Sequence, residues 1–110
     1  MAGYFELKPA AGDKFSFNLK AANNQVILTG ETYTTKAAAM DGIDSVKKNA
    51  SADARYERKV AKDNSPYFVL TAGNGQVIGK SEMYSSAAAM ENGITSVKAN
   101  APAADVKDLT

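Results

Sequence analysis

The 110-residue chain contains no cysteine, no histidine and no tryptophan. Without cysteine there can be no disulfide, thiol nucleophile or iron–sulfur cluster, and without histidine there is no imidazole base and no common zinc or copper ligand. The chain also has no marked excess of positive or negative charge. Its 13 Lys and Arg residues nearly balance 12 Asp and Glu residues, which gives a formal net charge of +1. That balance provides no field to attract nucleic acid or anionic lipid, so we expect neither as a partner.

Long apolar runs are missing as well. The longest ones, such as residues 26–28, fall far short of the roughly 20 residues that span a bilayer. The first residues also lack the apolar stretch of a secretory signal, so we expect a cytoplasmic protein. With 45% hydrophobic and 23% charged residues, the chain has the composition of one folded domain, which we place at residues 1–110.

The chain is an internal duplication with a period of 51 residues. Residues 3–51 align with residues 54–102 without a gap, and 21 of the 49 positions are identical. Unrelated segments of this length would share about three residues, so the two segments are copies of one unit. A short C-terminal tail, residues 103–110, follows the second copy.

Each copy predicts three strands and then a helix. Alternating apolar and polar residues at 15–20, with a counterpart at 67–71, indicate a strand that is buried on one face. Asn23-Asn24 and Asn74-Gly75 predict tight hairpin turns into strands around 26–28 and 77–78. An earlier strand is expected at 4–8 and again at 56–60, although Leu7 aligns there with Arg58.

The predicted helices begin after paired hydroxyl residues, Thr34-Thr35 and Ser85-Ser86, which suit N-caps. Apolar residues then recur at helical spacing and should face the sheet. These are Ala39, Ile43, Val46 and Ala50 in the first copy and Met90, Ile94, Val97 and Ala101 in the second. Gly42 and Gly93 interrupt both helices at a cost of roughly 1 kcal/mol each. We interpret them as points of close packing; a ligand that needs bare backbone is the alternative.

Three motifs occur in both copies: Gln-Val-Ile at 25–27, Tyr33 with two hydroxyl residues after it, and the run at 42–50. They resemble the YegP-like family of small bacterial proteins, over nearly the whole chain. The resemblance implies an α+β fold in which two tandem β-β-β-α repeats form one six-stranded antiparallel sheet. Both helices would pack on one face, each exchanged onto the other repeat's half. It also implies a monomer with an internal pseudo-two-fold axis, and it brings no activity, cofactor or catalytic residue.

The sheet face opposite the helices is the predicted partner surface, since an antiparallel sheet tolerates one open face. Its outward positions are Ser16, Asn18 and Lys20 in the first repeat and Tyr67, Val69 and Thr71 in the second. Tyr67 and Val69 would form a small exposed apolar patch, which is typical of protein contact. We therefore predict a small non-enzymatic protein-interaction domain without cofactor or metal. Whether the edge strands pair with a second chain stays open.

Two other functions are consistent with the sequence. One is binding of a small metabolite or anion near the pseudo-two-fold axis, at the helix starts. The other is a hydrolase-type enzyme using Glu31 and Glu82, which the duplication places at equivalent positions before the helices. Two carboxylates can do acid–base work when they lie about 5–10 Å apart. The ordinary interpretation of both glutamates is that they are solvated. Tyr33 and Tyr84 are expected to be buried rings whose hydroxyls reach a partner, or else ligand-stacking residues.

Overall fold

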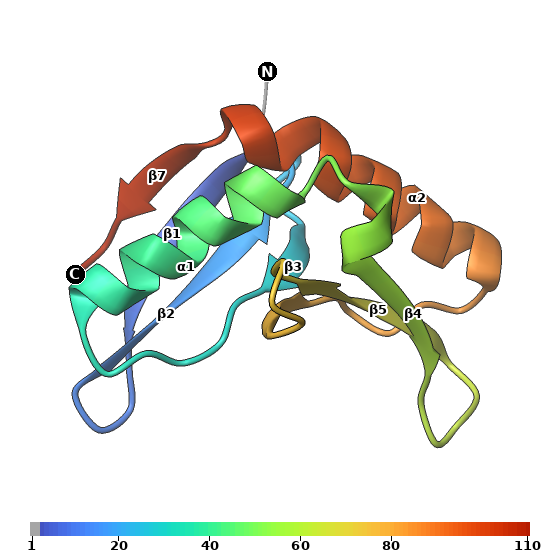
Figure 1. Cartoon of the computed structure of the whole chain (residues 1–110), viewed down its shortest axis with the longest axis horizontal. Coiled ribbons are helices and arrows are strands. Elements are labelled where there is room, and N and C mark those ends of the chain that lie inside the picture. The colour runs from blue at the N-terminus through green and yellow to red at the C-terminus, as the bar shows by residue number, and fades with distance from the viewer. Residues whose placement is uncertain (1–2) are drawn as a thin grey trace.

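The computed structural model describes residues 3–110, which form an α+β fold of two helices and a seven-stranded sheet (Figure 1). The strands are β1 (Tyr4–Ala10), β2 (Lys14–Lys20), β3 (Val26–Thr29), β4 (Tyr56–Val60), β5 (Pro66–Thr71), β6 (Val77–Lys80) and β7 (Asp105–Asp108). The helices are α1 (Lys36–Asn49) and α2 (Ala87–Asn100). Each helix is followed by a short 3₁₀ turn, η1 (Asp53–Arg55) after α1 and η2 (Ala101–Ala103) after α2.

The strand order is β4-β5-β6-β3-β2-β1-β7, so the two repeats meet at the centre, where β3 pairs antiparallel with β6. The expected six-stranded antiparallel sheet is corrected in one respect. Part of the C-terminal tail forms β7, which pairs with β1 in parallel. Ala104 and Val106 explain the docking, because Ala104 is buried in the core and Val106 packs against it. The sheet is therefore mixed.

The hairpin turns form where the sequence predicts them. Asn24 and Gly75 adopt positive φ values of 69° and 85°, the conformation that Asn and Gly tolerate best. In each turn the preceding asparagine closes the loop with its side chain. The Oδ1 atoms of Asn23 and Asn74 accept from the backbone N–H groups two residues on, at 3.0 Å in both cases.

Both helices lie on the same face of the sheet, as predicted (Figure 1). Thr35 and Ser86 are their N-caps, and each hydroxyl oxygen accepts from the backbone N–H three residues on. Exchange of helices between the repeats is partial. Helix α1 packs on β2 of its own repeat and also reaches β6, while α2 packs on β5 and reaches β3.

The core lies between the helices and the sheet, and most of it obeys the duplication. Phe17, Leu19, Ile43 and Val46 are fully buried, and so are their counterparts Phe68, Leu70, Ile94 and Val97, or nearly so. Leu28 breaks the symmetry at the centre. It aligns with Gly79, and a β-carbon on Gly79 would lie 2.7 Å from the Cδ2 atom of Leu28. One leucine thus fills the space that the two positions share.

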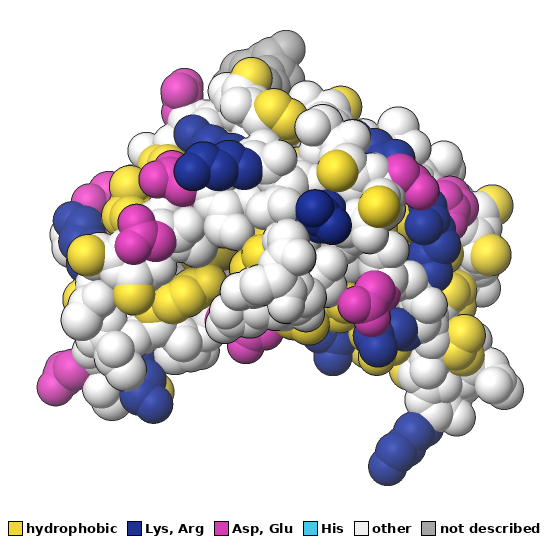
Figure 2. All heavy atoms as spheres, in the orientation of Figure 1, with side chains coloured by type: hydrophobic (Ala, Val, Ile, Leu, Met, Phe, Trp, Pro, Cys, Tyr) yellow, Lys and Arg dark blue, Asp and Glu magenta, His cyan; other side chains and the backbone are white. Residues whose placement is uncertain are grey.

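The outer surface shows no dominant patch in the view of Figure 2. Lysine and arginine side chains alternate there with acidic ones, and the apolar side chains are scattered. No helix within residues 3–110 is long and apolar enough to cross a membrane.

Candidate functional site

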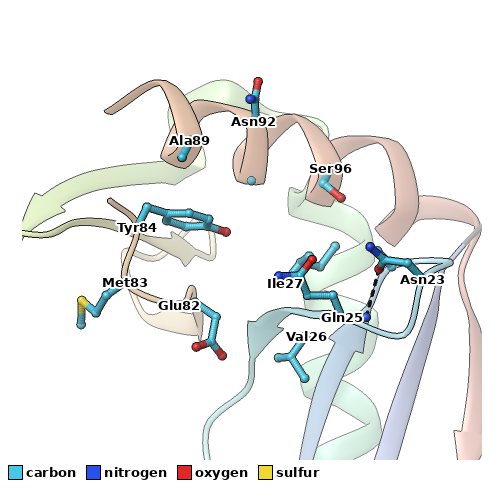
Figure 3. Close-up of a pocket in the computed structure, with 12 residues that line it drawn as sticks. Asn23, Gln25, Val26, Ile27, Glu82, Met83, Tyr84, Ala89, Asn92 and Ser96 are labelled. Carbon is cyan, nitrogen blue, oxygen red and sulfur yellow. Dashed lines mark hydrogen bonds between the residues drawn. The ribbon is translucent and has the colours of Figure 1, made fainter. Parts of the chain in front are cut away.

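A cavity of about 580 Å³ lies between the two repeats on the helix side of the sheet. Its walls are the β2–β3 turn and the start of β3 from the first repeat, and the β6–α2 connection and α2 from the second (Figure 3). Helix α2 reaches across the boundary between the repeats to contact β3 beside the cavity. Its polar lining residues are Asn23, Gln25, Glu82, Tyr84, Asn92 and Ser96.

Tyr84 forms one wall, and its hydroxyl points into the cavity (Figure 3). The ring stacks on Phe68 with a centroid separation of 6.3 Å and an interplanar angle of 11°. Its hydroxyl lies against Gly93, where a β-carbon would collide with the phenolic oxygen. Tyr33 meets Gly42 in the same way in the first repeat. The predicted close packing at the two helical glycines is therefore confirmed. In both repeats the tyrosine hydroxyl occupies the space that a β-carbon at the glycine position would otherwise fill.

The hydroxyl of Tyr84 is free to bind a ligand. Among residues 3–110, the tyrosine hydroxyls that hydrogen-bond are those of Tyr4 and Tyr56. Burial raises the pKa of Tyr84 above its ordinary value, and the nearby Glu82 carboxylate raises it further. The phenol therefore keeps its proton at neutral pH, and its O–H can donate while its oxygen accepts.

Glu82 gives the cavity its charge. Its carboxylate points into the open space below Tyr84 (Figure 3). The glutamates that form ion pairs within residues 3–110 are Glu6, Glu57 and Glu91, so the Glu82 carboxylate is unpaired there. No lysine or arginine of the described chain lines the cavity. The one charged side chain in the lining is therefore negative, which suits a cation or a neutral polar group and disfavours the predicted anion.

The two glutamates of the predicted enzyme do not share this site. Thr29 lies opposite Lys80 in the antiparallel β3–β6 pair, so Glu31 and Glu82, two residues beyond, are carried in opposite directions. In extended chain this places them about 13 Å apart, beyond the separation at which two carboxylates share one reacting group. Glu82 lines the cavity and Glu31 does not, and both side chains are exposed.

The predicted partner surface is only partly accessible. Alternation with buried Phe17, Leu19, Phe68 and Leu70 places all six residues on the outer face. Ser16, Lys20 and Tyr67 are half-buried there. Asn18, Val69 and Thr71 are buried instead.

Contacts within the sheet account for this difference. Val69 lies in register between Lys80 of β6 and Glu57 of β4, and the Thr71 hydroxyl donates to the backbone oxygen of Arg55 at 2.9 Å. The predicted apolar patch is therefore not exposed at Val69.

A second hollow, of about 530 Å³, lies where the start of β1 meets β7 and the β2–β3 turn. The polar groups there are already engaged or opposed. The Tyr4 hydroxyl donates to the Oδ1 atom of Asn24 at 2.9 Å, and Asp105 and Lys107 carry opposite charges along β7. The first cavity, with unpaired Glu82 and Tyr84, is thus the better candidate site.

The two-repeat architecture also appears in comparisons with known proteins. The family described as "Domain of unknown function (DUF1508)" matches the chain twice, at residues 10–57 and 61–108. The chain belongs to the DUF1508 family. The two matched DUF1508 segments start 51 residues apart, which is the period of the internal duplication.

Bacterial relatives match this chain over its whole length. The UPF0339 protein of Bordetella pertussis is 62% identical over 110 residues, covering 100% of this chain and 98% of that protein. The UPF0339 protein YegP of Shigella flexneri is 50% identical, with both chains fully covered. The solution NMR structure of the UPF0339 protein from Shewanella oneidensis matches with a TM-score of 0.94 at 53% identity, covering 100% of this chain and 93% of that one. The solution NMR structure of yegP from E. coli, of unknown function, matches equally well at 49% identity, covering 100% and 95%.

Sequence reasoning found some cavity residues and missed others. Glu82, Tyr84 and Gly93 stand out in the sequence, but Asn23 is explained there only as a turn residue, and Gln25 and Asn92 receive no site role. A signal for these residues exists in the duplication itself, because Asn23 and Gln25 are identical to their counterparts Asn74 and Gln76.

Proposed function

We propose that this protein is a non-enzymatic, cytoplasmic binding protein whose cavity between β3 and α2 holds a small polar molecule. One observation carries the proposal: the Tyr84 hydroxyl and the Glu82 carboxylate line a cavity of about 580 Å³ without a partner among residues 3–110. A concave site of a few hundred Å³ with a small number of convergent polar groups is the usual form of a small-molecule site.

Binding without catalysis fits the chemistry of the lining. Glu82 is the one carboxylate among the described residues that line the cavity, so the lining lacks the second carboxylate that the predicted hydrolase would need. Ser96 is the lining hydroxyl closest to a nucleophile in type, but its Oγ accepts from the Nδ2 atom of Asn100 at 3.2 Å and has no base beside it in the lining. These groups can orient and hold a ligand.

The test is a titration of isotopically labelled protein with a library of neutral, cationic and anionic metabolites, followed by ¹⁵N–¹H NMR. We expect at least one class to shift the amide signals of Gln25 and Gly93, and Tyr84→Phe to weaken that response about tenfold, the loss of one hydrogen bond. Tyr67→Phe is the matched control, because Tyr67 lies on the outer face. A library that shifts no cavity amide at millimolar concentration would overturn the proposal.

Contact with another protein through the outer face is the second candidate, and Tyr67 favours it. This half-buried ring has the Lys80 ammonium 5.1 Å from its centroid, and aromatic residues are enriched in protein interfaces. Tyr67→Ala should then abolish co-purification of a stoichiometric partner, while Ser16→Ala, at the aligned position of the first repeat, should not. Retention by both variants would contradict this function. We propose a monomer in either case, which light scattering would check.

A further inference from the structure

The two copies of the repeat are more alike at the positions that line the cavity than at the other aligned positions. Twelve residues line it, and ten of them are identical to their counterparts 51 positions away. The two exceptions are Met83, which aligns with Thr32, and Asn92, which aligns with Asp41. The other 37 aligned positions hold only 11 of the 21 identities. Retention is therefore concentrated on the residues that surround this space.

Folding explains part of this retention. Asn23 and Asn74 close the hairpin turns. Ser45 and Ser96 each hydrogen-bond the asparagine that ends their helix. The helical glycines make room for the tyrosine rings.

Three identical pairs carry polar groups that have no such role. The side chains of Gln25 and Gln76, the carboxylates of Glu31 and Glu82, and the hydroxyls of Tyr33 and Tyr84 form no hydrogen bond or ion pair within residues 3–110. Each of these groups can bind a ligand, and each is present twice.

Several contacts around the first set of residues are repeated around the second set. Helix α2 reaches β3 in the first repeat, and α1 reaches β6 in the second. Tyr33 packs on Gly42 of α1 and stacks on Phe17 at 6.1 Å and 14°, which repeats the geometry of Tyr84 within 0.2 Å in centroid separation. The start of β6 brings Gln76 to the position that Gln25 occupies at the start of β3.

Resting on the proposed function, we infer that the chain has two equivalent sites, one under each helix, and that each binds the ammonium group of a small organic amine. Glu82 and Tyr84 hold the ammonium in one site, and Glu31 and Tyr33 hold it in the other. Gln25 and Gln76 supply the amides that fix the remainder of the ligand.

The charge of the lining sets the ligand class. Each set of twelve residues contains a glutamate and neither contains a lysine or arginine. Glu31 raises the pKa of Tyr33 in the same sense as Glu82 raises that of Tyr84, after the larger effect of burial, so each carboxylate acts on its phenol. An ammonium donates to both a carboxylate and a phenolic oxygen, whereas an anion would meet repulsion.

Three four-carbon probes of matched length test the ligand class: putrescine, 1,4-butanediol and succinate. In ¹⁵N–¹H NMR titrations of the full chain, putrescine should shift the amides of Gly42 and Gly93, and the diol and the dianion should shift neither. Glu82→Gln should weaken the Gly93 response about tenfold or more and leave the Gly42 response unchanged. Glu31→Gln should do the reverse. Glu57→Gln, an exposed glutamate of β4, is the matched control and should change neither.

The failures of this inference and of the proposed function differ. Binding of succinate or the diol would overturn the amine class, although a cavity ligand would still exist. A putrescine response at Gly93 alone would overturn the second site. Equal shifts around every exposed carboxylate, Glu57 included, would show counter-ion binding only and would also overturn the inference. The proposed function fails separately, when no compound of the wider library shifts Gln25 or Gly93.

Discussion

The two edges of the sheet come from aligned segments of the duplication, but only one of them is covered by a further strand. At one edge β7 covers β1, and Leu7 is fully buried. At the other edge no described strand lies beyond β4, and Arg58 takes the position of Leu7. The helices differ in the same sense as the edge strands. An apolar residue of α1, Met40, aligns with an acidic residue of α2, Glu91. The guanidinium Nε of Arg58 donates to the Glu91 carboxylate at 2.5 Å.

This difference shows that an edge position takes its residue type from what covers it. A covered edge can hold an apolar pair, whereas an open edge needs groups that remain hydrated. Asp53 joins the open edge, since its carboxylate accepts from Arg58 at 3.2 Å and from Lys98 at 2.8 Å. These cations hold the pKa values of Asp53 and Glu91 below their ordinary values. Charges along an edge strand also discourage pairing with another chain, so β4 is a poor site for edge-to-edge association.

The largest expected effect comes from truncating the two aligned side chains. Leu7→Ala should lower the free energy of unfolding by about 2–5 kcal/mol, because it leaves a cavity in the core beside the edge that β7 covers. Arg58→Ala removes two solvent-exposed ion pairs, with Asp53 and Glu91, and should cost about 1 kcal/mol or less. Urea unfolding of both variants measures the difference. Equal losses would contradict the interpretation that coverage by β7 distinguishes the two edges.

The centre of the sheet offers a second comparison, between Leu28 and Gly79. Gly79→Leu places a second side chain in space that Leu28 already fills, and overpacking of this kind should cost about 1–3 kcal/mol. Adding Leu28→Gly exchanges the two residues across the pseudo-two-fold axis and should restore most of the loss, as measured by thermal unfolding. Gly73→Ala, whose β-carbon would have only an ordinary contact at 3.6 Å with Arg55, is the control. A double variant no more stable than Gly79→Leu alone would contradict the interpretation that one leucine fills the space between positions 28 and 79.

Local signals explain which parts of this fold the sequence predicts. The turns at Asn24 and Gly75, the caps at Thr35 and Ser86 and the helix ends follow from side chains within a few residues of each feature. β7 could not be predicted in this way, because Asp105–Asp108 has no strong alternation and becomes a strand only beside the edge of β1. The burial of Val69 likewise depends on neighbours from two other strands.

The candidate site could be predicted from the sequence only in part. Its residues are far apart in the sequence, since Gln25 and Tyr84 meet only after the two repeats pair through β3 and β6. Their juxtaposition therefore requires the three-dimensional structure. The retention of identical residues between the repeats is nevertheless visible in the sequence and marks the same positions.

The smallest expected effect is a change with pH in the stability of the edge that β7 covers. The Lys36 ammonium lies 2.5 Å from the Asp108 carboxylate and ties β7 to the start of α1. Its hydrogen bond, followed by those from Thr110, holds the pKa of Asp108 well below the ordinary value of 3.8. Because the folded-state pKa is lowered, this contribution to stability is present above pH 3.8 and is lost as the pH falls through the folded-state value.

Asp108→Asn should therefore lower the urea midpoint slightly at pH 7 and leave it almost unchanged at low pH, where wild-type Asp108 is protonated as well. Asp44→Asn, on the exposed face of α1 and outside the ion pairs of residues 3–110, is the control for loss of a carboxylate. The open edge should respond to acid independently through Asp53 and Glu91, so Arg58→Ala and Asp108→Asn should have additive effects at pH 7. Strong coupling between these two variants would mean that the edges do not act separately.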